Sequence, residues 1–418
     1  MRFKVLLSGI TSSRNRGVDA LVRTNVILIK EFFPESDIFI LSSDQNDKTA
    51  WSELGATVII LPKMPLVLRA LRKLTLEYPR GINKWYSRIL TPYLFDKLDL
   101  HIITGGDLFS SEYGDFRVWS NLITQVDRMY HPITYLSAHS IGRFQCEQHE
   151  KEFQGILEKS KVISVRESVT ERYLYERYAR CMKDKGIFPI KNPDPAFILP
   201  YQSTDYTNAI GKEISEMKLR TPKKQVIILN VSTGIANFKG LSPAVIYQKR
   251  LELAQAILSQ GIGLVLLAHV QGEDSLTNDV ALCKQMKAEL GRCEGQLISV
   301  INGSSVELKE IIRATDCLIA ERMHAAIAGL SQQIPTIVIS YSIKAEGILK
   351  DLFPLPTNYN KVYKPLAETV YCDVLAEIQA GIENIPCPET IHLQQYQKDV
   401  CIGYQTLAEI VKKQRIAL

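Results

Sequence analysis

The sequence predicts an α/β protein built from two doubly wound parallel sheets. Short apolar runs alternate with amphipathic helical patterns in both halves, as expected where parallel strands are joined by crossover helices. At 418 residues the chain is long for one hydrophobic core, so two domains are expected. We therefore predict a Rossmann-like domain over residues 1–200, a linker over 201–224, a second Rossmann-like domain over 225–390, and a C-terminal helix over 391–418 that docks on the body.

In the first half, six apolar runs have the length of buried strands, and helical patterns lie between several of them. The predicted strands are Phe3–Ser8, Asp37–Leu41, Thr57–Leu61, Leu100–Thr104, Ile133–Ala138 and Val162–Val165, and the predicted helices are Asp19–Phe33, Glu147–Ser160 and Val169–Tyr178. The polar stretch Tyr201–Lys224 interrupts this alternation and is therefore the predicted linker.

The second half repeats the pattern. Ser242-Pro243 has the residues of a helix start, with proline at the first helical position, and Ser304 and Glu307 have the spacing of a capping box. The predicted strands are Val226–Val231, Leu264–Ala268, Leu297–Ile301, Cys317–Ala320 and Thr336–Ser340, and the predicted helices are Pro243–Gln260, Asp279–Leu290, Leu308–Thr315, Ala325–Leu330 and the amphipathic Gln394–Ala417.

Composition limits the function classes. The formal net charge of +5, from 50 basic and 45 acidic residues, suits small anionic ligands or an anionic membrane surface and is too small to indicate nucleic acid binding. The eight cysteines are scattered without a C-x-x-C pair, and the His and Cys residues lack metal-ligand spacing, so we expect reduced thiols and no metal site. A strand at the very start and the lack of a long apolar run lead us to expect a cytoplasmic protein.

The stretch Leu66–Leu90 mixes arginine and lysine with Leu, Tyr and Trp85. One interpretation is an interfacial segment that brings the protein to the inner face of an anionic membrane. The other is a solvated helix face. The sequence leaves both open.

The most informative segment runs from Cys317 to Leu330. A buried strand is followed by Glu321-Arg-Met-His324 and then by a small-residue helix, so Arg322 and His324 stand in the turn. Ligands of open parallel sheets bind beyond the carboxyl ends of the strands, where helix N-termini attract anions. Arg322 and His324 are therefore predicted to hold a phosphate or a carboxylate.

Two further turns of the first half follow predicted strands. The turn after the first strand carries Asn15 and Asp19 and suits an anionic or sugar ligand, but it lacks a dinucleotide or P-loop signature. Gly105, Gly106 and Asp107 follow the fourth strand, and the paired glycines permit close backbone approach. For the first turn, a ligand-free loop with Asp19 as a helix cap is an equally good interpretation. For the second, a tight turn without a ligand is equally good.

Three more residues lie at strand ends. Arg166 follows Val162–Val165 and is suited to bidentate binding of an anion, although a surface pair with a neighbouring Glu would explain it too. Lys344 follows Thr336–Ser340, one strand from Arg322, and His269 follows Leu264–Ala268. Together they strengthen the prediction of an anion site.

These pieces, in this order, resemble the polysaccharide pyruvyl transferase family. The motifs that carry the resemblance are Val165-Arg166-Glu-Ser, Asp194-Pro-Ala-Phe197, Arg322-Met-His324-Ala and Ile339-Ser-Tyr-Ser-Ile-Lys344. The chain departs from the family pattern at Val18, where an acid is usual, and at Ala138-His139-Ser-Ile-Gly142-Arg143, where the family has Gly-Gln-Ser-Ile-Gly-Pro. These departures leave the acceptor open.

The resemblance implies two Rossmann-like domains facing a cleft, as in GT-B glycosyltransferases, and transfer of a pyruvyl group from phosphoenolpyruvate to a sugar as a cyclic ketal. It implies Arg166, Arg322 and His324 as catalytic donor-site residues, with Lys344 as a neighbour. From their places after strands, the residues expected to bind substrate are Lys344, Asn15, Asp19, Gly105, Gly106, Asp107 and His269. His324 is the expected general acid or base, because imidazole titrates near neutral pH. No cofactor beyond the donor is expected. The acceptor is a polysaccharide or glycolipid sugar, either soluble or lipid-linked.

Two other functions remain in view. A GT-B-type glycosyltransferase would use a nucleotide sugar, and Gly303 and Glu307 are the residues that fit it. A non-catalytic glycan-binding relative would be expected to have lost the Arg, His and Lys set, which this chain retains. The sequence does not indicate the oligomeric state or the ketalised hydroxyl pair.

Overall fold

The computed structural model describes residues 2–62, 81–94, 97–111, 116–235, 240–272, 274, 277–291, 295–340 and 342–416. The chain divides into two compact units. The first unit comprises Met1–Ser13, Leu21–Pro195 and Lys398–Leu418, and the second comprises Arg14–Ala20 and Ala196–Gln397. Helix α1 (Arg16–Phe32) begins in the short segment that is counted with the second unit.

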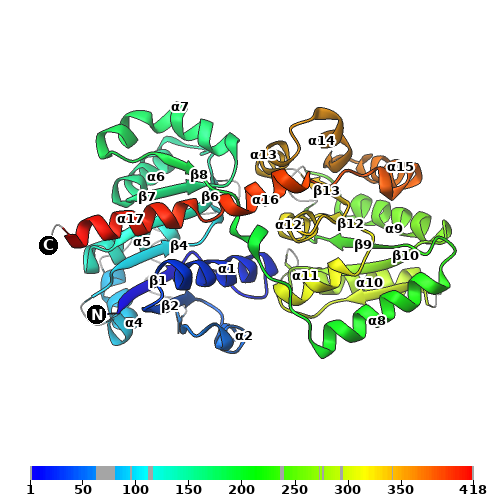
Figure 1. Ribbon diagram of the computed structural model, residues 1–418, viewed down its shortest axis with the longest axis horizontal. Coiled ribbons are helices and arrows are strands. Elements are labelled where there is room, and N and C mark those ends of the chain that lie inside the picture. The colour runs from blue at the N-terminus through cyan, green and yellow to red at the C-terminus, as the bar shows by residue number, and fades with distance from the viewer. Residues whose placement is uncertain are drawn as a thin grey trace. The chain divides into compact units, whose positions relative to one another are not determined.

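The first unit contains an eight-stranded parallel sheet with the order β3-β2-β1-β4-β6-β7-β8, and β5 pairs with β6 (Figure 1). Its strands are β1 (Phe3–Ser8), β2 (Ser36–Ser42), β3 (Thr57–Ile60), β4 (Leu100–Ile103), β5 (Gly106–Phe109), β6 (Ile133–Ile141), β7 (Val162–Val165) and β8 (Pro189–Lys191). Strands such as β4 and β7 are buried at every position, which explains their unbroken apolar sequences.

The helices of the first unit cover this sheet. They are α1, α2 (Asp47–Ala50), α4 (Gly81–Leu94), α5 (Arg117–Tyr130), α6 (Glu147–Lys159), α7 (Ser168–Lys185) and α17 (Ile402–Ile416), with a 3-10 helix at Ser52–Leu54. Helices α4 to α7 each contact the next in the series, and α17 packs against β6 and β7. Tyr404 of α17 stacks edge-on against Tyr135 of β6 and donates a hydrogen bond to Asn25 (2.6 Å).

The second unit contains a six-stranded parallel sheet with the order β11-β10-β9-β12-β13-β14. Its strands are β9 (Val226–Val231), β10 (Gly263–Ala268), β11 (Leu297–Val300), β12 (Cys317–Ala320), β13 (Thr336–Ser340) and β14 (Tyr363–Pro365). Its helices are α8 (Asp205–Arg220), α9 (Pro243–Ser259), α10 (Asp279–Leu290), α11 (Ser305–Arg313), α12 (Met323–Leu330), α13 (Ile343–Leu352), α14 (Pro356–Val362), α15 (Val370–Ala380) and α16 (Thr390–Asp399), with 3-10 helices at Pro195–Ile198 and Ile382–Asn384.

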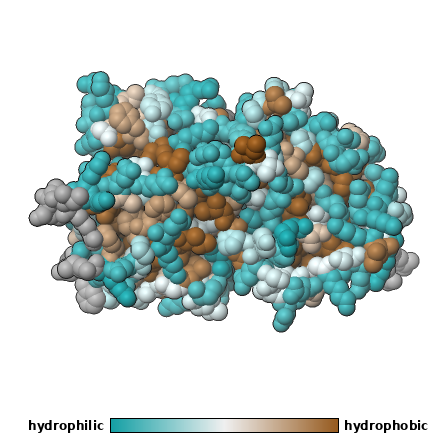
Figure 2. Space-filling view, viewed as in Figure 1, coloured by the Kyte–Doolittle hydropathy of each residue, from teal (hydrophilic) through white to brown (hydrophobic). Residues whose placement is uncertain are grey.

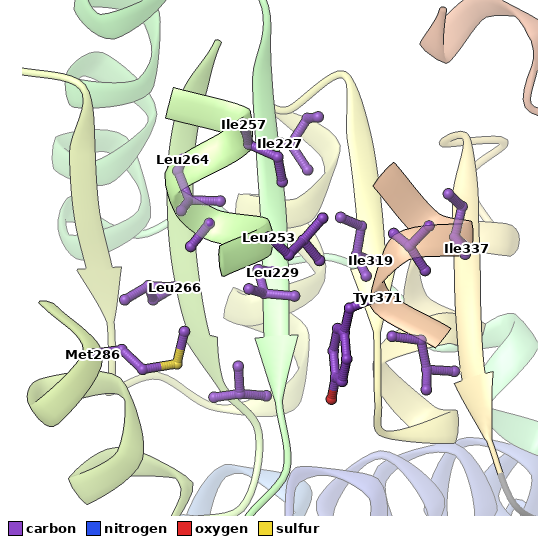
Figure 3. Close-up of a cluster of buried hydrophobic side chains, with 14 of the residues drawn as sticks. Ile227, Leu229, Leu253, Ile257, Leu264, Leu266, Met286, Ile319, Ile337 and Tyr371 are labelled. Atoms are coloured by element: carbon purple, nitrogen blue, oxygen red, sulfur yellow. The ribbon is translucent and has the colours of Figure 1, made fainter. Parts of the chain in front are cut away.

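Alternate strand residues form the core of the second unit (Figure 3). Leu229, Leu266 and Ile319 lie on neighbouring strands and point toward Leu253 of α9 and Tyr371 of α15. The intervening residues are buried as well, so both faces of the sheet are covered. Burying one such side chain contributes about 1.5–3 kcal/mol, so the apolar residues on both faces together stabilise the sheet.

The strand order of each sheet reverses once, between β1 and β4 in the first unit and between β9 and β12 in the second. Loops diverge to opposite sides at such a switch point and leave a crevice beyond the carboxyl ends of the strands. The turn that carries Arg322 follows β12, so it lies at the switch point of the second unit.

Every strand predicted from the sequence forms, within one or two residues except for the longer end of β6. The sequence did not predict β5, β8 and β14, which are only three or four residues long and contain glycine or proline. Such strands pair through their backbone without an apolar pattern that could mark them.

Two expectations about the chain's organisation were wrong. The predicted linker 201–224 contains α8, which Thr204 and Thr207 open with a capping box and which buries Ile214 and Met217. The helix predicted over Gln394–Ala417 is two helices, α16 in the second unit and α17 in the first. The chain bends at Val400 and Cys401, where Gly403 reaches the side chain of Asn192 with its backbone N–H (2.8 Å).

The predicted interfacial segment Leu66–Leu90 lies outside the described residues up to position 80, and its remainder begins α4, which buries Tyr86 and Leu90. In the described parts of the chain no helix is both long and apolar enough to cross a bilayer. Figure 2 shows a surface that is mostly hydrophilic on the face turned to the viewer.

Candidate functional site

A residue of the neighbouring strand β9 fixes the turn between β12 and α12. The backbone N–H of Arg322 donates to Oδ1 of Asn230 on β9 (3.0 Å), and Nδ2 of Asn230 donates to the carbonyl of Leu267 on β10 (3.0 Å). Arg322 is the N-cap of α12, whose residues from Ala325 to Leu330 are all buried. The small side chains of this helix let it pack tightly, so the turn has little freedom to move.

The side chain of Arg322 forms a two-point contact with a buried carboxylate. Its Nε and Nη2 donate to Oδ2 and Oδ1 of Asp279, at 3.1 and 2.7 Å. The Arg322 side chain is 24% exposed, whereas Asp279 is fully buried. The guanidinium is therefore held on Asp279, while the Arg322 side chain keeps partial access to solvent.

The residue before Arg322 belongs to a second buried ion pair. Glu321 accepts hydrogen bonds from Nε and Nη2 of Arg250 on α9 (2.8 and 2.7 Å), from the backbone N–H of Ser232 (2.7 Å) and from the hydroxyl of Tyr371 (2.6 Å). Burial opposes the charge on Arg250, but Glu321 outweighs it and raises the pKa of the guanidinium. This pair ties the turn to the end of β9.

His324 stands in the first turn of α12 and packs against the segment Arg14–Ala20. A Cβ placed on Gly17 would lie 2.3 Å from Nδ1 of His324, so only glycine fits at position 17 with the ring in this position. Asn15 forms an isolated antiparallel bridge with Val270, and its side chain accepts from the N–H of Gly17 (3.0 Å). Asn15 thus lies just before α1 and, through this hydrogen bond, holds the first turn of α1 beside His324.

His269 lies within the same group of residues. It is buried, and its carbonyl accepts from the backbone N–H of Arg16 (3.1 Å). Burial, followed by the positive charges of His324, Arg322 and Arg16, holds the pKa of the His269 imidazole well below its usual value. The ring is therefore neutral at physiological pH and can take part only as an uncharged group.

Asp19 caps a helix other than its own. Its Oδ2 accepts from the backbone N–H of Ser305, the first residue of α11, at 2.8 Å, and the side chain is buried. The capping box predicted for Ser304 and Glu307 is present on the same helix. Asp19 therefore holds the Arg14–Ala20 segment in the second unit, and the sequence analysis, which considered it as a cap of its own helix, missed this.

Lys344 stands in the first turn of α13 and is buried. Its backbone N–H donates to Oγ of Ser342, the N-cap of the helix (3.2 Å). β13, which precedes this helix, pairs directly with β12. Tyr341, which belongs to the sequence motif, is outside the described residues.

Arg166 belongs to the first unit and is almost completely buried. Its Nε donates to Ser140 (2.6 Å), Nη1 donates to Asp194 (2.8 Å) and Nη2 bonds Asp107. Burial opposes its charge, but Asp107 and Asp194 outweigh this effect and raise the pKa of the guanidinium. The alternative of a pair with a neighbouring Glu is correct for the partner, because Glu167 Oε2 lies 3.9 Å from Arg166 Nε, but wrong for the surface, because both side chains are buried. Burial raises the pKa of Glu167 to about 7.

Close packing explains the first of the two glycines before Asp107, and a positive φ explains the second. A Cβ on Gly105 would lie 2.6 Å from the carbonyl oxygens of Ser137 and Ala138, and Gly106 has a φ of 115°. The backbone here passes tightly over β6 and then forms β5. The Asp107 side chain is 32% exposed, the highest exposure among the ion-paired carboxylates of Arg166.

The structure thus groups the predicted residues by unit. Asn15, Asp19, His269, Arg322, His324 and Lys344 belong to the second unit, and Gly105, Gly106, Asp107 and Arg166 belong to the first. The sequence analysis missed Asp279, Asn230 and Gly17. Asp279 had one signal, because it is the first residue of a predicted helix that follows a strand end. In the ranges that the structure describes, no group of three or more His, Cys, Asp and Glu side chains has a metal-binding arrangement.

Two parallel α/β sheets place this chain in the GT-B-like class, and known structures agree. It is similar over 99% of its length to 98% of a glycosyltransferase from Rickettsia africae (14% identity, TM-score 0.52). It is similar over its full length to the whole of HepE from Anabaena in complex with UDP-glucose (11% identity, TM-score 0.53). It is also similar over 99% of its length to the whole of a UDP-GlcNAc 2-epimerase from Neisseria meningitidis (10% identity, TM-score 0.54). Identities this low establish the fold alone.

Within that class, the chain belongs to the polysaccharide pyruvyl transferase family, whose profile matches residues 15–343. A relative of known name is the amylovoran biosynthesis protein AmsJ of Erwinia amylovora. It is 22% identical over 435 residues, which cover 98% of this chain and 99% of AmsJ. The matched residues include the Arg14–Ala20 segment from Asn15 onward and the Arg322 turn.

Proposed function

We propose that this protein transfers the pyruvyl group of phosphoenolpyruvate to a sugar of a polysaccharide or glycolipid precursor and forms a cyclic ketal. Membership of the family supports the reaction class. The observation that carries the proposal is the Arg322 turn, where a guanidinium anchored on Asp279 precedes His324 by two residues at the switch point of the second sheet. A small donor with a carboxylate and a phosphate suits fixed cations at such a place.

In the proposed reaction, a proton is delivered to C3 of phosphoenolpyruvate, and C2 becomes cation-like. One sugar hydroxyl adds to C2 and loses its proton. A second hydroxyl then attacks C2, the C2–O bond to the phosphate breaks, and the proton of this hydroxyl leaves with the phosphate, so the products are the ketal and inorganic phosphate. No oxidation or reduction occurs, and no cofactor is required for the balance.

We assign the donor anions to Arg322 and Lys344, and the proton transfer to C3 to His324. His269, which is neutral, would act as an uncharged hydrogen-bonding neighbour. An adequate general acid is typically worth about 10²–10⁴-fold in rate.

In the first unit we propose a catalytic role for Arg166 and substrate binding for Asp107. Arg166 is already bonded to Ser140, Asp194 and Asp107, of which Asp107 is the exposed partner. A ligand that approached this network would therefore meet Asp107 first. This favours Asp107, with Gly105 and Gly106 before it, as a contact for an acceptor hydroxyl.

The experiment measures phosphate release from phosphoenolpyruvate with a panel of soluble and lipid-linked sugar acceptors. We expect release with at least one acceptor and a loss of about 10²-fold or more in His324→Ala, because the proton donor is gone. Binding of phosphoenolpyruvate, measured by calorimetry, should survive in that variant. A variant that binds the donor and still turns over at the wild-type rate would remove His324 from the proton transfer.

A second function is a nucleotide-sugar glycosyltransferase, which the fold of the UDP-glucose complex of HepE favours. The same panel tests it, because turnover of UDP-glucose or UDP-GlcNAc without phosphoenolpyruvate would replace the first proposal. The name of AmsJ refers to amylovoran biosynthesis, and fragments of amylovoran are therefore the first acceptors to test. We expect the reaction to take place in the cytoplasm, where phosphoenolpyruvate is available.

A further inference from the structure

Asp279 is a buried carboxylate that accepts hydrogen bonds from residues that follow three different strands. Its Oδ1 accepts from the backbone N–H and the hydroxyl of Thr233, which follows β9 (3.0 and 3.2 Å). Its Oδ2 accepts from the backbone N–H of Val270, which follows β10 (2.9 Å). Arg322, which follows β12, adds the two bonds described above. The carboxylate therefore has five donors and a single orientation.

This arrangement also determines the orientation of Arg322. Two parallel bonds from Nε and Nη2 fix the plane of the guanidinium, whereas one bond would allow it to turn. Asn230 fixes the backbone of the same residue. Groups of the second unit thus hold both the backbone and the guanidinium of Arg322, so the guanidinium has one orientation.

We propose that Asp279 is a positioning residue, which acts on the donor through Arg322 and does not touch the donor itself. This inference rests on the proposed function for its consequence in catalysis. Groups that orient a ligand-binding side chain are typically needed for full affinity, because an arginine that rotates loses the geometry of a bidentate contact.

A purely electrostatic role gives the opposite expectation. Asp279 is a negative charge beside a cation that we assign to anion binding, so its removal would then tighten donor binding. Positioning predicts weaker binding instead. In Asp279→Asn an amide nitrogen, which donates and cannot accept, replaces one carboxylate oxygen. Each oxygen accepts one bond from Arg322 and at least one from the segments after β9 or β10, so at least two bonds are lost and one of them is from Arg322.

The experiment compares the wild-type protein with Asp279→Asn in phosphate release at varied phosphoenolpyruvate. We expect kcat/KM for the donor to fall by about 10- to 100-fold, which is the usual range for a lost charged hydrogen bond. The fall should come mainly from KM. An unchanged or lower KM would overturn the proposal. If Asp279→Asn does not fold, Asp279→Glu takes its place, since it keeps the charge and shifts the carboxylate, and an unchanged KM there would overturn it equally.

Asp316 offers a matched control. It lies just before β12, at the opposite end of the sheet from Asp279. It accepts from the backbone N–H of Val226 at the start of β9 (2.8 Å) and from Lys218 of α8 (2.8 Å). Asp316→Asn should leave KM for the donor unchanged. An equal rise of KM in Asp316→Asn would show a general effect of weakening the sheet and would overturn the specific role of Asp279.

Arg322→Gln provides the coupling test. If Asp279 acts through Arg322, Asp279→Asn should have little additional effect on KM in that background. A second readout does not depend on turnover: the NMR resonance of the Arg322 Nε–H should shift and exchange faster with water in Asp279→Asn. A wild-type protein that releases no phosphate from phosphoenolpyruvate would refute the proposed function, whereas an unchanged Arg322 resonance would refute the positioning role.

Discussion

Gly17 and His324 come from segments more than 300 positions apart, and the packing of one leaves no room for a side chain on the other. Gly17 has an ordinary helical backbone conformation, because it is absent from the residues with positive φ. The requirement for glycine is therefore one of space at the imidazole. It is invisible in the sequence, where Gly17 is a single glycine between Arg16 and Val18.

We predict that Gly17→Ala lowers the rate of phosphate release at saturating donor by about 10-fold or more, because the added methyl displaces His324 from its position. Single-turnover assays with each variant would measure this. Gly211→Ala is the matched control. Apart from its chain neighbours and the backbone of α8, no atom of the described residues lies within 4 Å of the added Cβ. Alanine should therefore stabilise that helix by about 0.5–1 kcal/mol without affecting the rate. A rate in Gly17→Ala equal to that of the control would contradict the prediction.

At the scale of elements, the pair of Arg250 and Glu321 connects four parts of the second unit. Arg250 belongs to α9, Glu321 follows β12, Ser232 follows β9 and Tyr371 belongs to α15. Arg250 and Glu321 are almost completely buried and are bonded to each other at two points, so the group ties these elements together at the end of the sheet. Removing one partner would leave an unpaired charge in the core.

Glu321→Gln should therefore lower the free energy of unfolding by about 3–5 kcal/mol, which urea denaturation of the purified protein would measure. Glu216, which pairs with Arg220 on the exposed surface of α8, is the control. Glu216→Gln should cost less than about 0.5 kcal/mol, since an exposed i,i+4 pair contributes little. Similar losses in the two variants would mean that the buried pair is not a special source of stability.

At the scale of the whole molecule, buried histidines determine how stability varies with pH. Burial lowers the pKa of His101 and His139 to about 3, and His269 is also well below its ordinary value. The unfolded chain takes up protons at these positions below about pH 6.5, whereas the folded protein does not. Their contribution is complete above that pH and is lost as the pH falls from 6.5 toward 3.

Glu167 acts in the other direction. Its pKa is raised to about 7 from 4.5, so the folded protein binds a proton between pH 7 and 4.5 that the unfolded chain does not yet bind. Each of these groups changes the free energy of unfolding by about 1.4 kcal/mol per pH unit at most. Three histidines therefore outweigh one glutamate, and acidification should destabilise the protein.

We predict that the free energy of unfolding falls between pH 7 and 5. The fall should be smaller in His101→Gln, which removes one proton-binding site of the unfolded state, and larger in Glu167→Gln, which removes the offset. Urea titrations at several pH values would give these slopes, which are independent of any constant loss that a substitution causes. Equal slopes in the three proteins would contradict this account.

The sequence predicted the elements best where apolar residues are continuous. β9 and β12 are unbroken apolar runs, and their bounds are those predicted. β8 and β14 were missed, because a three-residue strand at a sheet edge requires only backbone pairing. α8 was taken for a linker, because its few buried residues lie within a polar sequence.

What the sequence determined by itself is the fold class, the family and the turn that carries Arg322 and His324. These depend on local patterns: the alternation of strands and helices and the residues that follow a strand. What only the tertiary structure decided is which distant residues surround that turn. Asp279, Gly17 and Asn230 lie there because the order of strands reverses between β9 and β12 and because Asp19 caps α11. Contacts of this kind depend on how the chain closes in space, and no periodicity along the chain encodes them.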